Sequence, residues 1–106
     1  MNSQDLAAAS WVDQNAPIGQ FIYADHYAQL RLDTVAGPNR PGVFDAITPQ
    51  TLDQHAWVYA TSVNLKYKTV RSLVGTDETS YAFPSRFLDS NYDVVYTNGT
   101  SEVFHR

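Results

Sequence analysis

Asp25 and His26 have the residue types of an acid–base pair. A carboxylate can fix the tautomer of a nearby imidazole and raise its basicity, as in many general bases. Neighbouring residues of a strand point to opposite faces, so these two side chains could cooperate only at a bulge. A nucleophile would have to come from elsewhere, such as Ser62 or Ser80. We therefore expect no catalytic residues, and we interpret Asp25 and His26 as a surface pair.

A metal site could in principle combine His26, His55 and His105 with Asp53, because imidazole and carboxylate ligands suit zinc or iron. The spacing gives no support, since Asp53 and His55 are two residues apart rather than one helical turn. The chain has no cysteine, which excludes a cysteine-based site. Its five glycines form no phosphate-binding motif. We expect neither a metal nor a cofactor.

Lys66, Lys68 and Arg71 form a short basic group. A basic strip with aromatic side chains nearby is typical of single-strand nucleic-acid binding. Here the neighbouring aromatic residues belong to the opposite face of the expected strand, and the net charge of the chain is −4. We therefore expect no nucleic-acid partner, and we interpret the lysines as protection of a strand edge.

The aromatic content is high, with seven Tyr, five Phe and two Trp in 106 residues. The interior of one small β-domain cannot cover so many rings, and tyrosine suits a contact surface because it is large, rigid and polar at one end. Tyrosine also fits any pleated strand, so a purely structural explanation stays open. The expected interface residues are Leu6, Trp11, Tyr23, Tyr27, Tyr92 and Tyr96.

An alternative places a single concave site at Asp25, His26, Trp57 and Tyr59, next to the loop 37–42. Aromatic side chains with a few polar groups are typical of small-ligand pockets. In this alternative the chain is a small ligand- or carbohydrate-binding module, or a small enzyme.

The first half of the chain contains one clear helix and one ambiguous segment. Ser3 can cap a helix that runs to about Asp13. Residues 18–35 fit a strand with a bulge at Asp25–His26, although 23–34 could also be helical. Two glycines and two prolines predict a loop at 37–42. Thr48–Pro49 predicts the start of a short helix that ends near His55.

The pattern of the second half of the chain predicts mainly strands. Apolar and polar residues alternate from Trp57 to Leu73, which predicts one long strand. A turn at 75–77 leads to a short strand at 79–83, and 85–91 is expected to be a connection. Asn98–Gly99 predicts a type I′ hairpin between strands at 92–97 and 100–105.

These elements predict a single mainly β domain over residues 1–106, a small barrel or sandwich of five or six mostly antiparallel strands with a short N-terminal helix. Residues 1–16 form a helical arm and 18–106 a β-rich body. If 23–34 is helical, the class becomes α+β. The sequence has no apolar run of 18 residues and no basic N-terminal region. We expect a soluble protein without a membrane span or signal peptide, and the compartment stays open.

The function that this reading favours is a non-enzymatic structural or assembly subunit. Its contacts would be with copies of itself or with a neighbouring structural protein. A composition rich in Thr, Ser, Asn and Tyr, without cysteine, suits small subunits of viral or phage particles, and the virion would then be its location.

Overall fold

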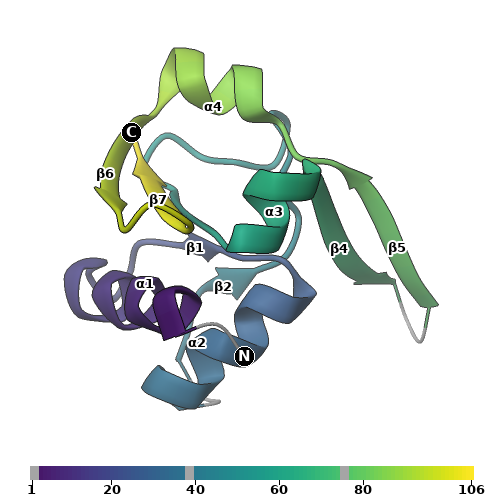
Figure 1. The fold of residues 1–106 in the computed structure, drawn as a ribbon. Coiled ribbons are helices and arrows are strands. Elements are labelled where there is room, and N and C mark those ends of the chain that lie inside the picture. The colour runs from purple at the N-terminus through teal and green to yellow at the C-terminus, as the bar shows by residue number, and fades with distance from the viewer. Residues whose placement is uncertain (1–2, 38–39, 75–76) are drawn as a thin grey trace.

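The computed structural model describes residues 3–37, 40–74 and 77–106, and it is an α+β fold (Figure 1). The elements in chain order are α1 (Ser3–Asn15), β1 (Ile22–Tyr23), α2 (His26–Ala36), β2 (Val43–Phe44), β3 (Trp57–Ala60), α3 (Ser62–Tyr67), β4 (Thr69–Val74), β5 (Asp77–Ala82), α4 (Ser85–Asn91), β6 (Asp93–Thr97) and β7 (Glu102–His105). None of the helices in these ranges is long and apolar enough to cross a membrane.

The main sheet is mixed and has the strand order β2-β1-β3-β7-β6. β1 runs parallel to both β2 and β3, whereas β7 runs antiparallel to β3 and β6. β4 and β5 form a separate antiparallel hairpin, which extends away from the rest of the molecule in Figure 1. The sheet does not close, so the predicted barrel or sandwich is wrong.

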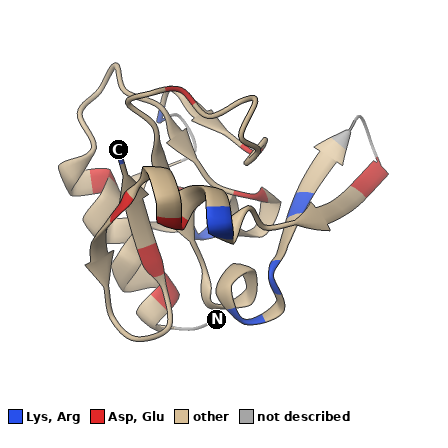
Figure 2. Ribbon diagram, turned by 90° about the horizontal axis from the view of Figure 1, so that it is seen from above, with Lys and Arg blue, Asp and Glu red and all other residues tan. Residues whose placement is uncertain are grey.

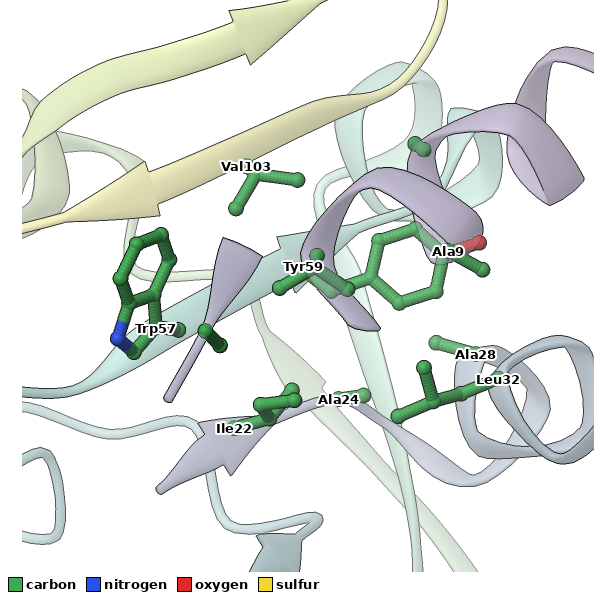
Figure 3. Packing of buried hydrophobic residues seen from close by; sticks show 11 residues of the cluster. Ala9, Ile22, Ala24, Ala28, Leu32, Trp57, Tyr59 and Val103 are labelled. Atoms are coloured by element: carbon green, nitrogen blue, oxygen red, sulfur yellow. The ribbon is translucent and has the colours of Figure 1, made fainter. Parts of the chain in front are cut away.

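The core consists of two clusters on opposite faces of the main sheet. The first joins Trp57, Tyr59 and Val103 to the buried sides of α1 and α2 (Figure 3). The second joins the alternate residues Val58 and Phe104 to α4 and to the segment before β3. Both faces of β3 are therefore buried, and this strand is the centre of the molecule.

The bulged strand expected over residues 18–35 is wrong for most of its length, because His26–Ala36 form α2, as the α+β alternative allowed. The expected bulge at Asp25 is instead a helix cap, because the Asp25 carboxylate accepts a hydrogen bond from the Ala28 N–H. Gly37, with φ of 85°, ends the helix.

The long strand predicted from Trp57 to Leu73 is also wrong, since it is β3, α3 and β4 in succession. Thr61 and Asn64 form a capping box that starts α3, and Lys68, with φ of 57°, ends it in the left-handed region. Residues 85–91 form α4 rather than a connection. The helix expected from Thr48 is a single turn, in which Leu52 N donates to Thr48 O.

The N-terminal helix and the last hairpin are confirmed. The hairpin turn is not type I′, because Asn98 lacks a positive φ. Its side-chain oxygen instead accepts from the N–H groups of Thr100 and Ser101. The strand expected at 79–83 is confirmed as β5, while its turn at 75–77 lies largely outside the described residues.

Candidate functional site

Asp25 lies at the junction of three elements, and its carboxylate is fully used there. One oxygen accepts from Ala28 N at 2.9 Å, and the other accepts from Asn64 Nδ2 at 2.8 Å and from Arg71 N at 3.1 Å. The residue is 2% exposed, so the expectation of a surface pair is wrong for Asp25. These bonds tie the start of α2 to α3 and β4. The geometry therefore assigns Asp25 a structural role, and it does not pair Asp25 with His26.

The residues of the expected ligand pocket do not converge. The His26 ring is half-buried and lies against Tyr27, with 5.3 Å between the ring centroids. Tyr59 is fully buried, and its hydroxyl donates to the backbone carbonyl of Asp5. Trp57 stacks on His105 at 3.8 Å in the first cluster. Of the four predicted residues, Asp25 alone lines the pocket that the structure has between α2, α3 and β4.

That pocket has a volume of about 340 Å³ and is lined by Asp25, Tyr27, Arg31, Thr61, Val63 and Arg71. Both guanidinium groups already have acidic partners. Arg71 Nη1 lies 2.9 Å from Glu78 Oε1, and Arg31 Nε lies 3.9 Å from Asp5 Oδ2. Hydrogen bonds from Arg71 and then from the Tyr27 hydroxyl lower the pKa of the Glu78 carboxyl below its ordinary value. The pocket thus has polar walls whose charges are largely balanced.

Asp5 is a second buried carboxylate, which the sequence analysis missed. It is 2% exposed and accepts from Ser62 N, from Ser62 Oγ and from Ser101 Oγ. This connects α1 to the start of α3 and to the residue before β7. A signal was present in the sequence, since Asp5 lies one turn before the small apolar residues Ala8 and Ala9 and therefore on the same helix face.

The expected interface residues occupy different environments. Tyr23 and Tyr92 are buried in the second cluster, where their hydroxyls donate to the carbonyls of Thr51 and Asp53. Burial raises the pKa of both phenols. Leu6 is half-buried, and Trp11 stacks on Tyr96 with centroids 5.2 Å apart. Tyr27 is 39% exposed and donates to Glu78.

The structure also shows where the histidines and the basic group lie. His55 is exposed and His105 is covered by Trp57. Within residues 3–37, 40–74 and 77–106, no three His, Asp or Glu side chains lie close enough together to hold a metal ion. Lys66, Lys68 and Arg71 lie on α3, at its C-cap and on β4, rather than along one strand.

The β4–β5 hairpin has two outer edges, and their backbone groups lie in different environments. In an antiparallel pair, alternate residues direct their backbone N–H and C=O groups away from the partner strand. On β4 the outward N–H groups of Arg71 and Leu73 donate to Asp25 at 3.1 Å and to Asp45 at 3.2 Å. The outer edge of β4 is therefore capped by carboxylates of the same chain.

Phe83 N donates to Lys68 O, so the backbone groups of Phe83 face the β4 side of the hairpin. Because the direction alternates along a strand, the backbone groups of Glu78, Ser80 and Ala82 point away from β4. We call their backbone groups the open edge of β5. In the part of the chain that the structure describes, no third strand pairs with it. All three residues are exposed. β5 contains no proline or lysine, and its pairing with β4 has no register shift.

The edges of the main sheet are less suitable for pairing. β2 has two residues. β6 shifts register between Val94 and Tyr96, and such irregularities are a common means of protecting an edge strand. Among the described strands, the open edge of β5 is thus the longest regular edge that is not capped, and we treat it as the candidate functional site.

Comparison of the chain with protein-family models, with curated proteins and with solved structures finds no match. The geometry of the hairpin and of the pocket beside it is therefore the basis for assigning a function.

Proposed function

We propose that this chain is a protein-interaction module that binds an extended segment of a protein chain at the open edge of β5. The observation that carries the proposal is the contrast between the two edges of one hairpin. Backbone groups at the edge of a sheet form hydrogen bonds readily with an added strand, which is a recurring mode of peptide recognition. The chain caps one edge with Asp25 and Asp45 and leaves the other accessible.

The proposal keeps the expectation of contacts between protein chains but changes the residues that make them. Tyr23 and Tyr92 are covered by their own chain, so these two expected interface residues are not available to a partner. The edge offers main-chain hydrogen bonds instead, and the exposed side chains of Glu78, Ser80 and Ala82 would set register and selectivity. The expectation of a viral or phage particle stays a prediction from composition.

The test uses proline at Ser80. Its N–H points outward, so Ser80→Pro blocks strand addition and leaves the hydrogen bonds between β4 and β5 intact. Ser80→Ala is the matched control, because it removes the hydroxyl and keeps the N–H. Peptides selected from a random displayed library on the full chain are titrated by fluorescence anisotropy onto both variants.

We expect Ser80→Pro to weaken peptide binding at least about tenfold, which corresponds to ~1.4 kcal/mol, and Ser80→Ala to bind like the wild type. Circular dichroism should show the same fold for both variants. Equal affinity of the two variants, or a library that yields no binder, would overturn the proposal.

The pocket at Asp25 favours a second candidate, the binding of a small polar ligand. Its volume of about 340 Å³ lies within the range of small-molecule sites, and two guanidinium groups line it. A panel of sugars, nucleotides and small carboxylates can be screened by thermal shift, since a ligand of the native state raises the unfolding midpoint. We expect Val63→Trp, which fills the mouth from an exposed position, to abolish any such shift. A panel without any shift at millimolar concentration would argue against this candidate.

A further inference from the structure

We infer that the segment which pairs with β5 is the β5 strand of a second copy of this chain, running antiparallel with Ser80 opposite Ser80. This inference rests on the proposed function and names its partner. The result would be a continuous four-stranded antiparallel sheet in the order β4-β5-β5-β4 across two copies. Four observations on the hairpin support it: the alternation of outward residues, the distribution of charge, the small side chains and the capping of β4.

The alternation of β5 permits this register. A two-fold axis at Ser80 places Glu78 opposite Ala82 of the second copy and Ser80 opposite itself. Every outward residue then faces another outward residue, which is the condition for hydrogen-bonded pairs in an antiparallel ladder. A shift by one residue would place outward groups opposite groups already bonded to β4.

The charges of the hairpin favour the antiparallel direction. Asp77 and Glu78 begin β5, whereas Lys68 lies beside its other end, where Phe83 N bonds Lys68 O. Figure 2 shows the acidic segment next to the grey tip and basic segments toward the base. In a parallel pair the acidic ends of two copies would meet, and like charges side by side are destabilising. The antiparallel pair brings the acidic end of each copy to the basic end of the other.

Two of the three outward residues, Ser80 and Ala82, have side chains small enough for close approach. The centre of the pair would hold Ser80 twice, and each Glu78 would face the methyl group of Ala82. Tyr81 has a large side chain that is directed elsewhere, because its hydroxyl accepts from Ile47 N and donates to the carbonyl of Asp45. Two six-residue strands form a small contact, so we expect a weak, concentration-dependent dimer.

The capped edge of β4 explains why pairing would stop at two copies. Once the β5 strands have paired, the outer edges of the four-stranded sheet are two β4 strands. Their outward N–H groups at Arg71 and Leu73 are already bonded to Asp25 and Asp45 of their own chain. Sheets that keep an unprotected edge are prone to continued addition. The capping therefore closes the assembly as a symmetric dimer rather than a fibre.

A single cysteine provides the test, because the natural chain has none. In the proposed dimer, the cysteine of Ser80→Cys would lie opposite the same cysteine of the second copy. Their Cα atoms would be within the separation that a disulfide requires, about 4.4–6.8 Å. Thr79→Cys is the matched control on the same exposed strand. In the proposed register, residue 79 lies opposite residue 81 of the second copy, two residues away from the cysteine of that copy. The Cα atoms of the two cysteines would then be more than about 7 Å apart, too far for a disulfide. Both full-length variants are oxidised under the same conditions, and covalent dimer is followed by non-reducing electrophoresis.

We expect Ser80→Cys to form covalent dimer at least about tenfold faster than Thr79→Cys. Sedimentation of the chain without cysteine should show a weight-average mass that rises with concentration, and Ser80→Pro should remain monomeric. Equal cross-linking rates with a monomeric wild type would overturn the inference. If library peptides still bind in that case and lose affinity in Ser80→Pro, strand addition stands and the second copy is not its partner. If they do not, both proposals fall.

Discussion

Buried carboxylates at Asp5 and Asp25 connect segments of this chain that are far apart in the sequence. Each is 2% exposed and each accepts at least three hydrogen bonds from other parts of the chain. A buried charge is costly unless it is paired and hydrogen-bonded, so loss of these contacts would lower the stability of the fold. They also position the open edge, because Asp25 anchors the first half of β4.

Asp5→Ala tests this role at a single residue. The substitution leaves the donors of Ser62 and Ser101 without an acceptor and the partly buried Arg31 without its partner. We expect the free energy of unfolding to fall by about 3–5 kcal/mol, as when one partner of a buried pair is removed. Urea denaturation measures the change. Asp89→Ala, on the exposed side of α4, is the control and should change stability by less than about 0.5 kcal/mol. Equal losses in the two variants would contradict the structural role of Asp5.

Tyr59 gives a prediction for alkaline pH. Burial is the main reason that the pKa of Tyr59 is raised above its ordinary value of 10.0. The folded state therefore keeps this proton to a higher pH than the unfolded state does. Its contribution to stability is complete below pH 10 and is lost as the pH rises above 10.

Tyr59→Phe should lower stability at pH 8 by about 1–2 kcal/mol, because the Asp5 carbonyl loses its hydrogen bond. It should also flatten the decline of stability above pH 10. Urea titrations between pH 8 and 11 compare the two proteins, and exposed lysines affect both equally. Parallel curves would show that Tyr59 ionises as easily in the folded state as in the unfolded state.

At the scale of the elements, the sequence predicted the two ends of the chain better than its middle. The helix at α1 and the hairpin of β6 and β7 follow from local patterns that tertiary contacts do not oppose. The alternation from Trp57 onward predicted a strand correctly as far as Ala60. Beyond that point the capping box of Thr61 and Asn64 starts helix α3. The alternation of apolar and polar residues does not reveal this helix start.

The candidate site was largely invisible in the sequence for a physical reason. Asp25 was interpreted as a surface residue, but it is buried, and its partners Asn64 and Arg71 are 39 and 46 residues away in the sequence. The difference between the two edges of the hairpin depends on those long-range contacts and on Asp45. A single sequence has no pattern that records them.

Lys68 connects α3 to the β4–β5 hairpin in a strained backbone conformation. Its φ of 57° lies in the left-handed region between α3 and β4. A branched side chain at Cβ is poorly tolerated there, whereas glycine is not strained. We expect Lys68→Val to lower stability by about 1–2 kcal/mol and Lys68→Gly to leave it unchanged or raise it by up to about 1 kcal/mol. Thermal denaturation ranks the variants, and a Lys68→Val protein as stable as Lys68→Gly would refute the assigned backbone strain.

At the scale of the whole molecule, the central strand links two clusters that lie on opposite faces of one sheet. Trp57 and Tyr59 belong to the first cluster, and Val58 and Ala60 to the second. Neither cluster could persist without β3, since each takes alternate side chains of the same four residues. We therefore expect the domain to unfold in one cooperative transition, as small single domains usually do.

Leu88→Ala tests that coupling from the far side of the molecule. Leu88 is fully buried on α4 in the second cluster, whereas Trp11 and Trp57 both report on the first. The substitution should cost about 2–5 kcal/mol, and the unfolding midpoints from tryptophan fluorescence and from far-UV circular dichroism should fall by the same amount. Leu30→Ala, 47% exposed on α2, is the control and should move neither midpoint appreciably. If the fluorescence midpoint stayed in place while the circular dichroism transition shifted, the two faces of the sheet would be separate folding units. The hairpin, whose buried Val70 belongs to the second cluster, could then detach while the first cluster stayed folded.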